Sequence, residues 1–137
     1  QDPHNLGAII RTAEAAGADG VIIPKRRSAT VNPTVFKTSA GAAAWIKIAR
    51  VSNLVDTIKT LKKHGVWVYG AEADGTPIDK ADLSGALALV IGSEGFGLGK
   101  LRENCDVVLS LPMFGKVNSL NASVCAGILM YEAVKYR

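Results

Sequence analysis

Apolar residues recur along the chain in two alternating patterns, short contiguous runs and helical spacings. The contiguous runs predict strands at residues 21–23, 45–49, 66–69, 87–91 and 107–111. Helical spacing predicts helices at about residues 5–17, 33–40, 52–65, 98–104 and 120–136. Strands separated by helices predict a parallel sheet covered on both faces, in one α/β domain.

Residue types that favour helix ends and turns mark several of these boundaries. Asn5 and Ser52 are expected to cap the first and third helices, and Asn32 followed by Pro33 is typical of a helix start. Residues 72–85 break the pattern and are expected to form a surface excursion with a turn at Asp74-Gly75.

Length and cysteine content narrow the class of protein. A chain of 137 residues can bury a core without disulfides. Cys105 and Cys125 are therefore expected to be small core residues in a reducing, cytoplasmic compartment. The apolar runs are too short to cross a bilayer, and the two cysteines fit no metal-ligand spacing, so neither a membrane anchor nor a metal is expected.

Positive charge is concentrated in the first half of the chain. Residues 1–70 carry ten Lys or Arg against four Asp or Glu, whereas residues 71–137 carry six against eight. The densest cluster is Lys25, Arg26 and Arg27. This asymmetry favours a polyanionic partner such as RNA, and the alternative is a solvated surface.

The glycine-rich segment at residues 92–99 follows a predicted strand and suggests a nucleotide site. It lacks the Gly-Lys-Ser/Thr ending of a phosphate-binding loop, and Lys100 stands where a dinucleotide fingerprint beginning at Gly95 needs its third glycine. Glu94 would also repel a pyrophosphate. An adenosine ligand without phosphates, such as S-adenosylmethionine, fits better; the alternative is a tight strand-to-helix turn without a ligand.

Polar side chains also gather at two other places. At the start of the chain, Arg11 points off the apolar face of its predicted helix and is either functional or solvated, while His4 is expected to be a turn residue. After the last predicted strand, Asn118, Ser119 and Asn121 supply more small polar groups than one helix cap requires. This second group is typical of a binding loop.

Three segments, at residues 2–17, 89–98 and 111–132, resemble the three motifs of the SpoU family of RNA 2′-O-ribose methyltransferases. The resemblance is strongest to the bacterial branch that methylates a guanosine ribose in 23S rRNA. It implies a SPOUT fold, in which a parallel sheet carries a deep C-terminal trefoil knot, as well as S-adenosylmethionine as cofactor and a homodimer. Residues 1–137 would form the catalytic domain, without the opening strand and RNA-binding domain that usually precede the first motif.

The resemblance also implies roles for individual residues. Cofactor contacts fall on Ala71, Gly92, Leu111, Met113 and Leu120. The polar catalytic set consists of Asn5, Arg11, Glu94, Ser119 and Asn121. RNA contacts fall on Lys25, Arg26, Arg27 and Lys116. Close helix packing at the dimer interface is expected at the small residues Ala122, Ala126 and Gly127.

The role of Arg11 and the substrate both leave alternatives. Arg11 is either a base or an electrostatic stabiliser, and the second is favoured because a guanidinium stays protonated in nearly all settings. The alternatives to methylation of rRNA are the same chemistry on tRNA and a non-catalytic knotted RNA-binding module. A nucleotide-binding oxidoreductase is disfavoured because the dinucleotide fingerprint is missing.

Overall fold

The computed structural model describes residues 3–25, 33–92 and 97–137. Its α-helices are α1 (Pro3–Ala15), α2 (Pro33–Thr38), α3 (Leu54–Lys63) and α4 (Ala122–Val134). Its strands are β1 (Gly20–Pro24), β2 (Lys47–Val51), β3 (Trp67–Pro77), β4 (Leu87–Val90) and β5 (Val107–Ser110). Short 3₁₀ helices are η1 (Ala42–Ala44), η2 (Ile78–Lys80) and η3 (Gly99–Asn104). This order confirms the predicted alternation of strands and helices.

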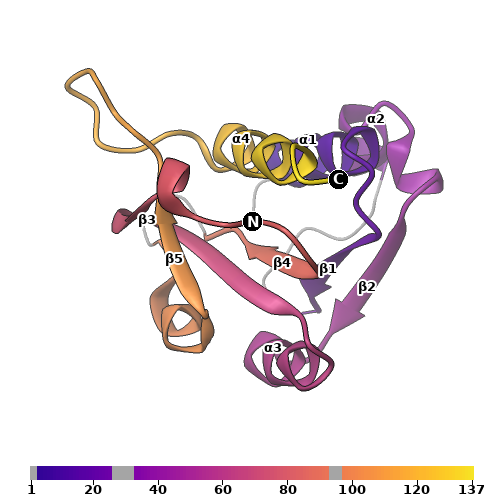
Figure 1. Ribbon diagram of the computed structural model, residues 1–137. Helices are drawn as coiled ribbons and strands as arrows, with labels where there is room; N and C mark the ends of the chain where they lie inside the picture. Colours follow the sequence, from indigo (N-terminus) through magenta and orange to yellow (C-terminus); the bar gives the residue numbers. More distant parts are fainter. Residues whose placement is uncertain (1–2, 26–32, 93–96) are drawn as a thin grey trace.

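All strand pairs between the described residues are parallel, but they form two sheets. One sheet contains β1 and β2, and the other has the order β4-β3-β5. Helices α1, α2 and α4 lie on one side of the strands, while α3 and η3 lie on the other (Figure 1). The parallel pairing and the covered faces confirm that part of the prediction, but the strands form two sheets instead of the single sheet predicted. None of the described helices is long and apolar enough to cross a membrane.

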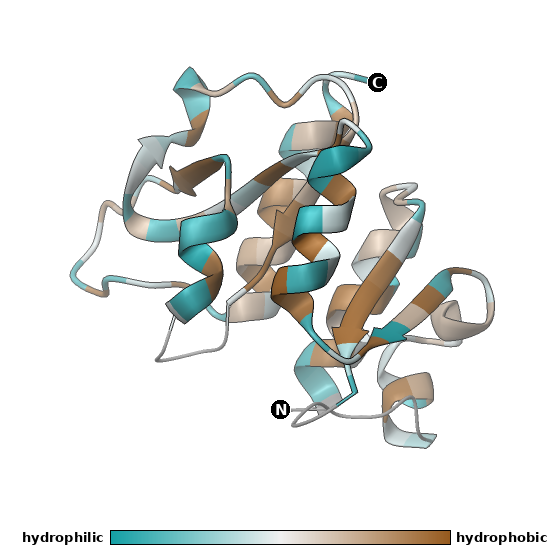
Figure 2. Ribbon diagram, turned by 90° about the horizontal axis from the view of Figure 1, so that it is seen from below, coloured by the Kyte–Doolittle hydropathy of each residue, from teal (hydrophilic) through white to brown (hydrophobic). Residues whose placement is uncertain are grey.

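Two clusters of buried apolar residues hold the layers together. The larger one joins the β4-β3-β5 sheet to α4 and includes Tyr69, Leu83, Leu109, Leu129 and Ala133. The smaller one joins α1, α2 and η1 and consists of Ile10, Val35 and Ala42. Figure 2 shows apolar stretches in the interior, where these clusters lie, and polar stretches on the outer faces of the helices.

Helix α4 packs against α1 within the same chain, and small residues make this contact close. Ala126 is fully buried, and a Cβ added to Gly127 would lie 3.6 Å from Thr12 Cγ2 of α1. The expectation that Ala126 serves a dimer interface is therefore wrong, because this residue is buried within the chain. For Ala122 and Gly127, which are half-buried, the expectation stays a prediction.

Two predicted caps are also wrong. Asn5 lies inside the first turn of α1, which already begins at Pro3. Asn53 rather than Ser52 caps α3, because its Oδ1 accepts a hydrogen bond from the Asp56 N–H at 3.1 Å. Adjacent residues of similar capping propensity cannot be told apart by sequence, since the choice depends on where the helix docks.

Strand β3 is longer than predicted and enters the expected surface excursion. Its pairing with β5 is interrupted between Ala71 and Thr76 and then resumes, with Thr76 opposite Leu109. Gly75 permits the return, because an added Cβ would lie 2.6 Å from the backbone carbonyl of Leu109. The Ser110 hydroxyl also donates to the Gly75 carbonyl at 2.9 Å. The segment therefore folds back onto β5.

We predict that Gly75→Ala lowers the free energy of unfolding by about 1–3 kcal/mol, because the new methyl group must push β3 away from the β5 backbone. Urea denaturation measures this loss. Gly115→Ala is the matched control: nothing lies within 4 Å of its Cβ position, so its unfolding free energy should change by less than about 0.5 kcal/mol. Equal stability of the two variants would contradict the described β3–β5 contact.

Candidate functional site

Three of the predicted cofactor positions, Ala71, Gly92 and Leu111, lie at one edge of the β4-β3-β5 sheet. Ala71 pairs with Leu109, and Gly70 beside it pairs with Val90 of β4. Gly92 follows β4 by two residues, and Leu111 directly follows β5. This is the carboxyl edge of parallel strands, where α/β proteins bind ligands.

The described ends of the glycine-rich segment meet each other at this edge. A Cβ added to Gly92 would lie 2.3 Å from the Gly97 carbonyl oxygen, so only glycine allows this approach. Gly97 has φ +60°, a conformation that favours glycine. Leu98 is buried, and a Cβ on Gly70 would lie 2.5 Å from its Cδ1. The glycines thus bring Gly97 against Gly92 and Leu98 onto β3; Glu94 lies outside the described residues.

A carboxylate of β3 contacts the same segment. Glu72 Oε2 accepts a hydrogen bond from the Leu98 N–H at 2.9 Å, and its Oε1 pairs with Arg102 Nη1. Arg102 Nη1 also pairs with Asp74 Oδ1 at 2.8 Å. The Leu98 N–H, and next the Arg102 guanidinium, hold the pKa of Glu72 below its ordinary value. Arg102 lowers the pKa of Asp74 in the same way.

In the segment after β5, neighbouring residues lie in different surroundings, one in the core and the others at a cavity. Leu111 is half-buried and packs against the larger core cluster. Its neighbours face a cavity of about 340 Å³ lined by Pro77, Ile78, Asp79, Ser110, Pro112 and Phe114. Met113 is half-buried, whereas Lys116 and Ser119 are exposed and Leu120 is 38% exposed. None of the five predicted cofactor residues lines this cavity.

Asn121 is the cap of α4. Its side-chain Oδ1 accepts hydrogen bonds from the Ser123 N–H at 2.9 Å and from the Ser123 hydroxyl at 2.6 Å. The cap therefore leaves Ser119, two residues earlier, as an additional exposed hydroxyl beside the helix start. This agrees with the prediction that the segment carries more polar groups than the helix needs.

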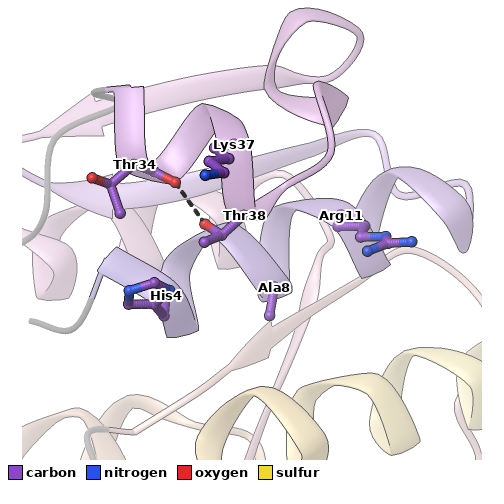
Figure 3. Close-up of a pocket in the computed structure, with 6 residues that line it drawn as sticks. All are labelled: His4, Ala8, Arg11, Thr34, Lys37 and Thr38. Atoms are coloured by element: carbon purple, nitrogen blue, oxygen red, sulfur yellow. Dashed lines mark hydrogen bonds between the residues drawn. The ribbon is translucent and has the colours of Figure 1, made fainter.

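A cationic cavity of about 660 Å³ lies between α1 and α2 (Figure 3). It is lined by His4, Ala8, Arg11, Thr34, Lys37 and Thr38. Arg11 and Lys37 are exposed, and none of the ion pairs between described residues includes either of them. The Thr38 hydroxyl donates to the Thr34 carbonyl at 2.9 Å. Such a cavity attracts an anion.

The cavity contains Arg11, which the sequence predicts as a candidate, and His4, which lies in α1 instead of the expected turn. The other four lining residues are not singled out by the sequence: Ala8, Thr34, Lys37 and Thr38. Thr34, Lys37 and Thr38 are spaced three and four residues apart on a predicted helix, so one polar helix face was the available signal. Asn5 is half-buried on α1 and does not line the cavity.

The remaining candidates are placed only in part. Lys25 is exposed directly after β1, and its backbone N–H donates to the Val51 carbonyl at 2.8 Å. Arg26 and Arg27 lie outside the described residues. Arg11 and Asn121 come from α1 and α4, which pack side by side. In the described part of the chain, no group of three His, Cys, Asp or Glu side chains is arranged to hold a metal.

Comparison with known proteins agrees with this architecture. The model of the SpoU rRNA Methylase family matches residues 1–131. A protein of Staphylococcus haemolyticus named for the TrmH family of tRNA/rRNA methyltransferases is 54% identical over 140 residues, which cover 100% of this chain and 56% of that protein. The chain thus spans about half the length of the curated relatives it matches.

Solved structures show the same similarity. The SpoU methyltransferase AviRb of Streptomyces viridochromogenes, solved with AdoMet, has a TM-score of 0.88 and 31% identity over 98% of this chain and 56% of its own. The AdoMet-bound rRNA methyltransferase of Sinorhizobium meliloti has a TM-score of 0.90 and 33% identity over 98% of this chain and 52% of its own. The fold is that of these α/β methyltransferases. The chain belongs to the SpoU rRNA Methylase family.

We predict that the protein loses stability as the pH falls below about 4.5, the ordinary pKa of Glu72. Because the folded pKa is lower, the unfolded state binds more protons in this range, and the contribution of Glu72 disappears as the pH falls through the folded pKa. Urea denaturation between pH 6 and pH 3 measures the effect.

Glu72→Gln supplies the comparison, because it removes this titration and leaves the other carboxylates. Its stability should decline less steeply with falling pH than that of the unchanged protein. Identical slopes for the two proteins would contradict the lowered pKa of Glu72.

Proposed function

We propose that this chain is the catalytic domain of an S-adenosylmethionine-dependent enzyme that methylates a ribose 2′-hydroxyl in RNA. The observation that carries the proposal is the position of the cationic cavity. It lies on α1, which packs against α4, and α4 begins where the segment leaving the carboxyl edge of β4-β3-β5 ends. Helix α1 thus carries the candidate polyanion site, and the sheet edge from which the chain runs into α4 carries the candidate cofactor site.

The residues at the strand ends fit the cofactor. Ala71 and Leu111 offer half-buried apolar surface, and Gly92 brings the Gly97 backbone against the same edge. This combination suits an adenosine with no phosphates. Met113 and Leu120 are assigned the same role by their place in the third motif. When bound, S-adenosylmethionine supplies an electrophilic methyl group.

Arg11 serves in this proposal as an electrostatic residue. Its guanidinium stays protonated, so it holds a phosphate beside the target ribose and stabilises negative charge that develops on the 2′-oxygen. Lys37 and His4 extend the cavity and would contact the adjoining RNA backbone. Asn5, Glu94, Ser119 and Asn121 orient the ribose, and Lys25, Arg26, Arg27 and Lys116 add contacts to RNA.

The target and the assembly complete the proposal. We assign the target as a guanosine of 23S rRNA, with tRNA as the second candidate because related proteins are named for both. The segment after β5 would form the trefoil knot. Two copies would pair through an exposed apolar stripe at helical spacing on α4, which consists of Val124, Ile128 and Tyr131.

The cysteines agree with a cytoplasmic location. Cys105 and Cys125 are half-buried free thiols, and burial raises the pKa of each. A raised pKa leaves less of the reactive thiolate. Both residues therefore act as packing residues, as predicted from the sequence.

We predict that Arg11→Ala lowers the rate of methyl transfer to RNA at least 100-fold while the affinity for S-adenosylmethionine changes less than threefold. The reason is that Arg11 acts on RNA and the developing charge and does not contact the cofactor. Single-turnover transfer of labelled methyl groups and calorimetry measure the two quantities. Arg50→Ala removes an equally exposed arginine of β2 and serves as control. Equal losses of transfer and cofactor affinity would overturn the assignment.

We predict that Lys37→Ala weakens RNA binding severalfold and reduces the salt dependence of binding by about one phosphate contact. Its KM for RNA rises more than its kcat falls, because Lys37 holds the backbone and not the reacting atoms. RNA titrations at several salt concentrations measure the slope. Lys59→Ala, on an exposed position of α3, should leave the slope unchanged. The same slope in the Lys37 variant and the unchanged protein would remove Lys37 from the RNA site.

A further inference from the structure

Glu72 connects β3 to the end of the glycine-rich segment, and no catalytic or binding role has so far been given to it. We propose that Glu72, held by Arg102, is a positioning residue that fixes Gly97 and Leu98, at the end of this segment, in the arrangement that allows S-adenosylmethionine to bind at the edge formed by Gly92. The inference rests on the proposed function, because it deepens the account of the same cofactor edge.

Glu72 is placed where β3 leaves its regular pairing with β5. It follows Ala71 directly, and the paired register resumes only at Thr76. Its carboxylate therefore projects from the irregular part of the strand toward η3. There it accepts the Leu98 N–H at 2.9 Å and pairs with the Arg102 guanidinium.

Leu98 transmits the position of Glu72 to the cofactor edge. Its side chain is 3% exposed and covers Gly70 of β3, while its backbone follows Gly97. The Gly97 carbonyl in turn lies against Gly92, where a Cβ would be 2.3 Å away. If Leu98 moved away from Glu72, the Gly97 carbonyl would move with it, and the backbone of Gly92 would lose its contact with that carbonyl.

The exposure of the two carboxylates that pair with Arg102 shows which of them holds Leu98 in place. The Glu72 side chain is 23% exposed and accepts a backbone N–H as well as the guanidinium, whereas that of Asp74 is 74% exposed and pairs only with Arg102 among the described residues. An exposed ion pair contributes little because water screens it. Glu72 therefore positions the segment, and Asp74 adds a minor contact.

Asp106 offers a closely matched control at the opposite end of β3. Its side chain is also 23% exposed, accepts the Val68 N–H at 2.7 Å and pairs with Lys62 at 3.6 Å. Its contacts are thus of the same kind as those of Glu72. Because Val68 is the second residue of β3, Asp106 contacts the strand near its start, away from the cofactor edge.

The test is calorimetry with S-adenosylhomocysteine, the product form of the cofactor, alongside urea denaturation of each variant. Glu72→Ala should lower the affinity about tenfold, the size expected for loss of a hydrogen-bonded charge. Glu72→Gln retains an acceptor for the Leu98 N–H and should lose less, about threefold. Asp106→Ala should lose stability comparably to Glu72→Ala but keep its affinity within twofold, and so should Asp74→Asn.

Three results would overturn the inference. One is unchanged affinity of folded Glu72→Ala, or of Glu72→Gln if the alanine variant does not fold. Another is a loss of affinity in Asp106→Ala as large as in Glu72→Ala, since general destabilisation would then explain both. The third is failure of the unchanged protein to bind S-adenosylhomocysteine, which would reject the proposed function together with the inference that rests on it.

Discussion

The parallel pairing of β3 with β4 on one side and β5 on the other sets the position of every group at the cofactor edge. Tyr69 stands opposite both Leu89 and Val107, so β4 and β5 end close to the level of Ala71, where β3 leaves its regular pairing. Parallel strands cannot be joined by tight turns, and each connection must cross a face of the sheet. The segments that leave these ends, at residues 71, 92 and 111, are for that reason brought together although they are far apart in the chain.

Helix α4 depends on the same sheet. Leu129 and Ala133 of α4 pack with Tyr69 and Leu109 in the larger core cluster, and α4 also contacts α1. Arg11 is carried by α1, so α4 lies between the sheet and the helix that bears Arg11 in this chain of contacts. Packing inside the chain therefore links the anion-binding cavity to the proposed cofactor site.

Much of the fold could be predicted because the strands are short apolar runs separated by helical spacings, and this signal is local. The errors occur where tertiary contacts decide. The choice of Asn53 over Ser52 as a cap depends on helix docking, and the extension of β3 past Ala71 depends on Gly75 meeting the β5 backbone. Likewise, the small residues of α4 suit close packing with any helix, and only the fold identifies α1 as the partner.

Part of the candidate site follows from the motifs, and part does not. Gly92 and Leu111 lie at strand ends, and Asn121 is a cap, so the sequence pattern indicates their places. Lys37 and Glu72 were missed because their surroundings come from other elements. Lys37 shares its cavity with residues of α1, and Glu72 contacts Leu98 at the start of η3 and Arg102 within it. Neither residue stands in a segment that resembles a family motif.

The central claim is that the chain transfers a methyl group from S-adenosylmethionine to a ribose 2′-oxygen of RNA. The direct measurement is incubation of the protein with labelled S-adenosylmethionine and, separately, unmodified 23S rRNA and tRNA, followed by complete digestion and identification of the labelled nucleoside. The account predicts a 2′-O-methylated nucleoside, guanosine in rRNA first. A label found on a base, or no transfer to either RNA by protein that binds the cofactor, would contradict it.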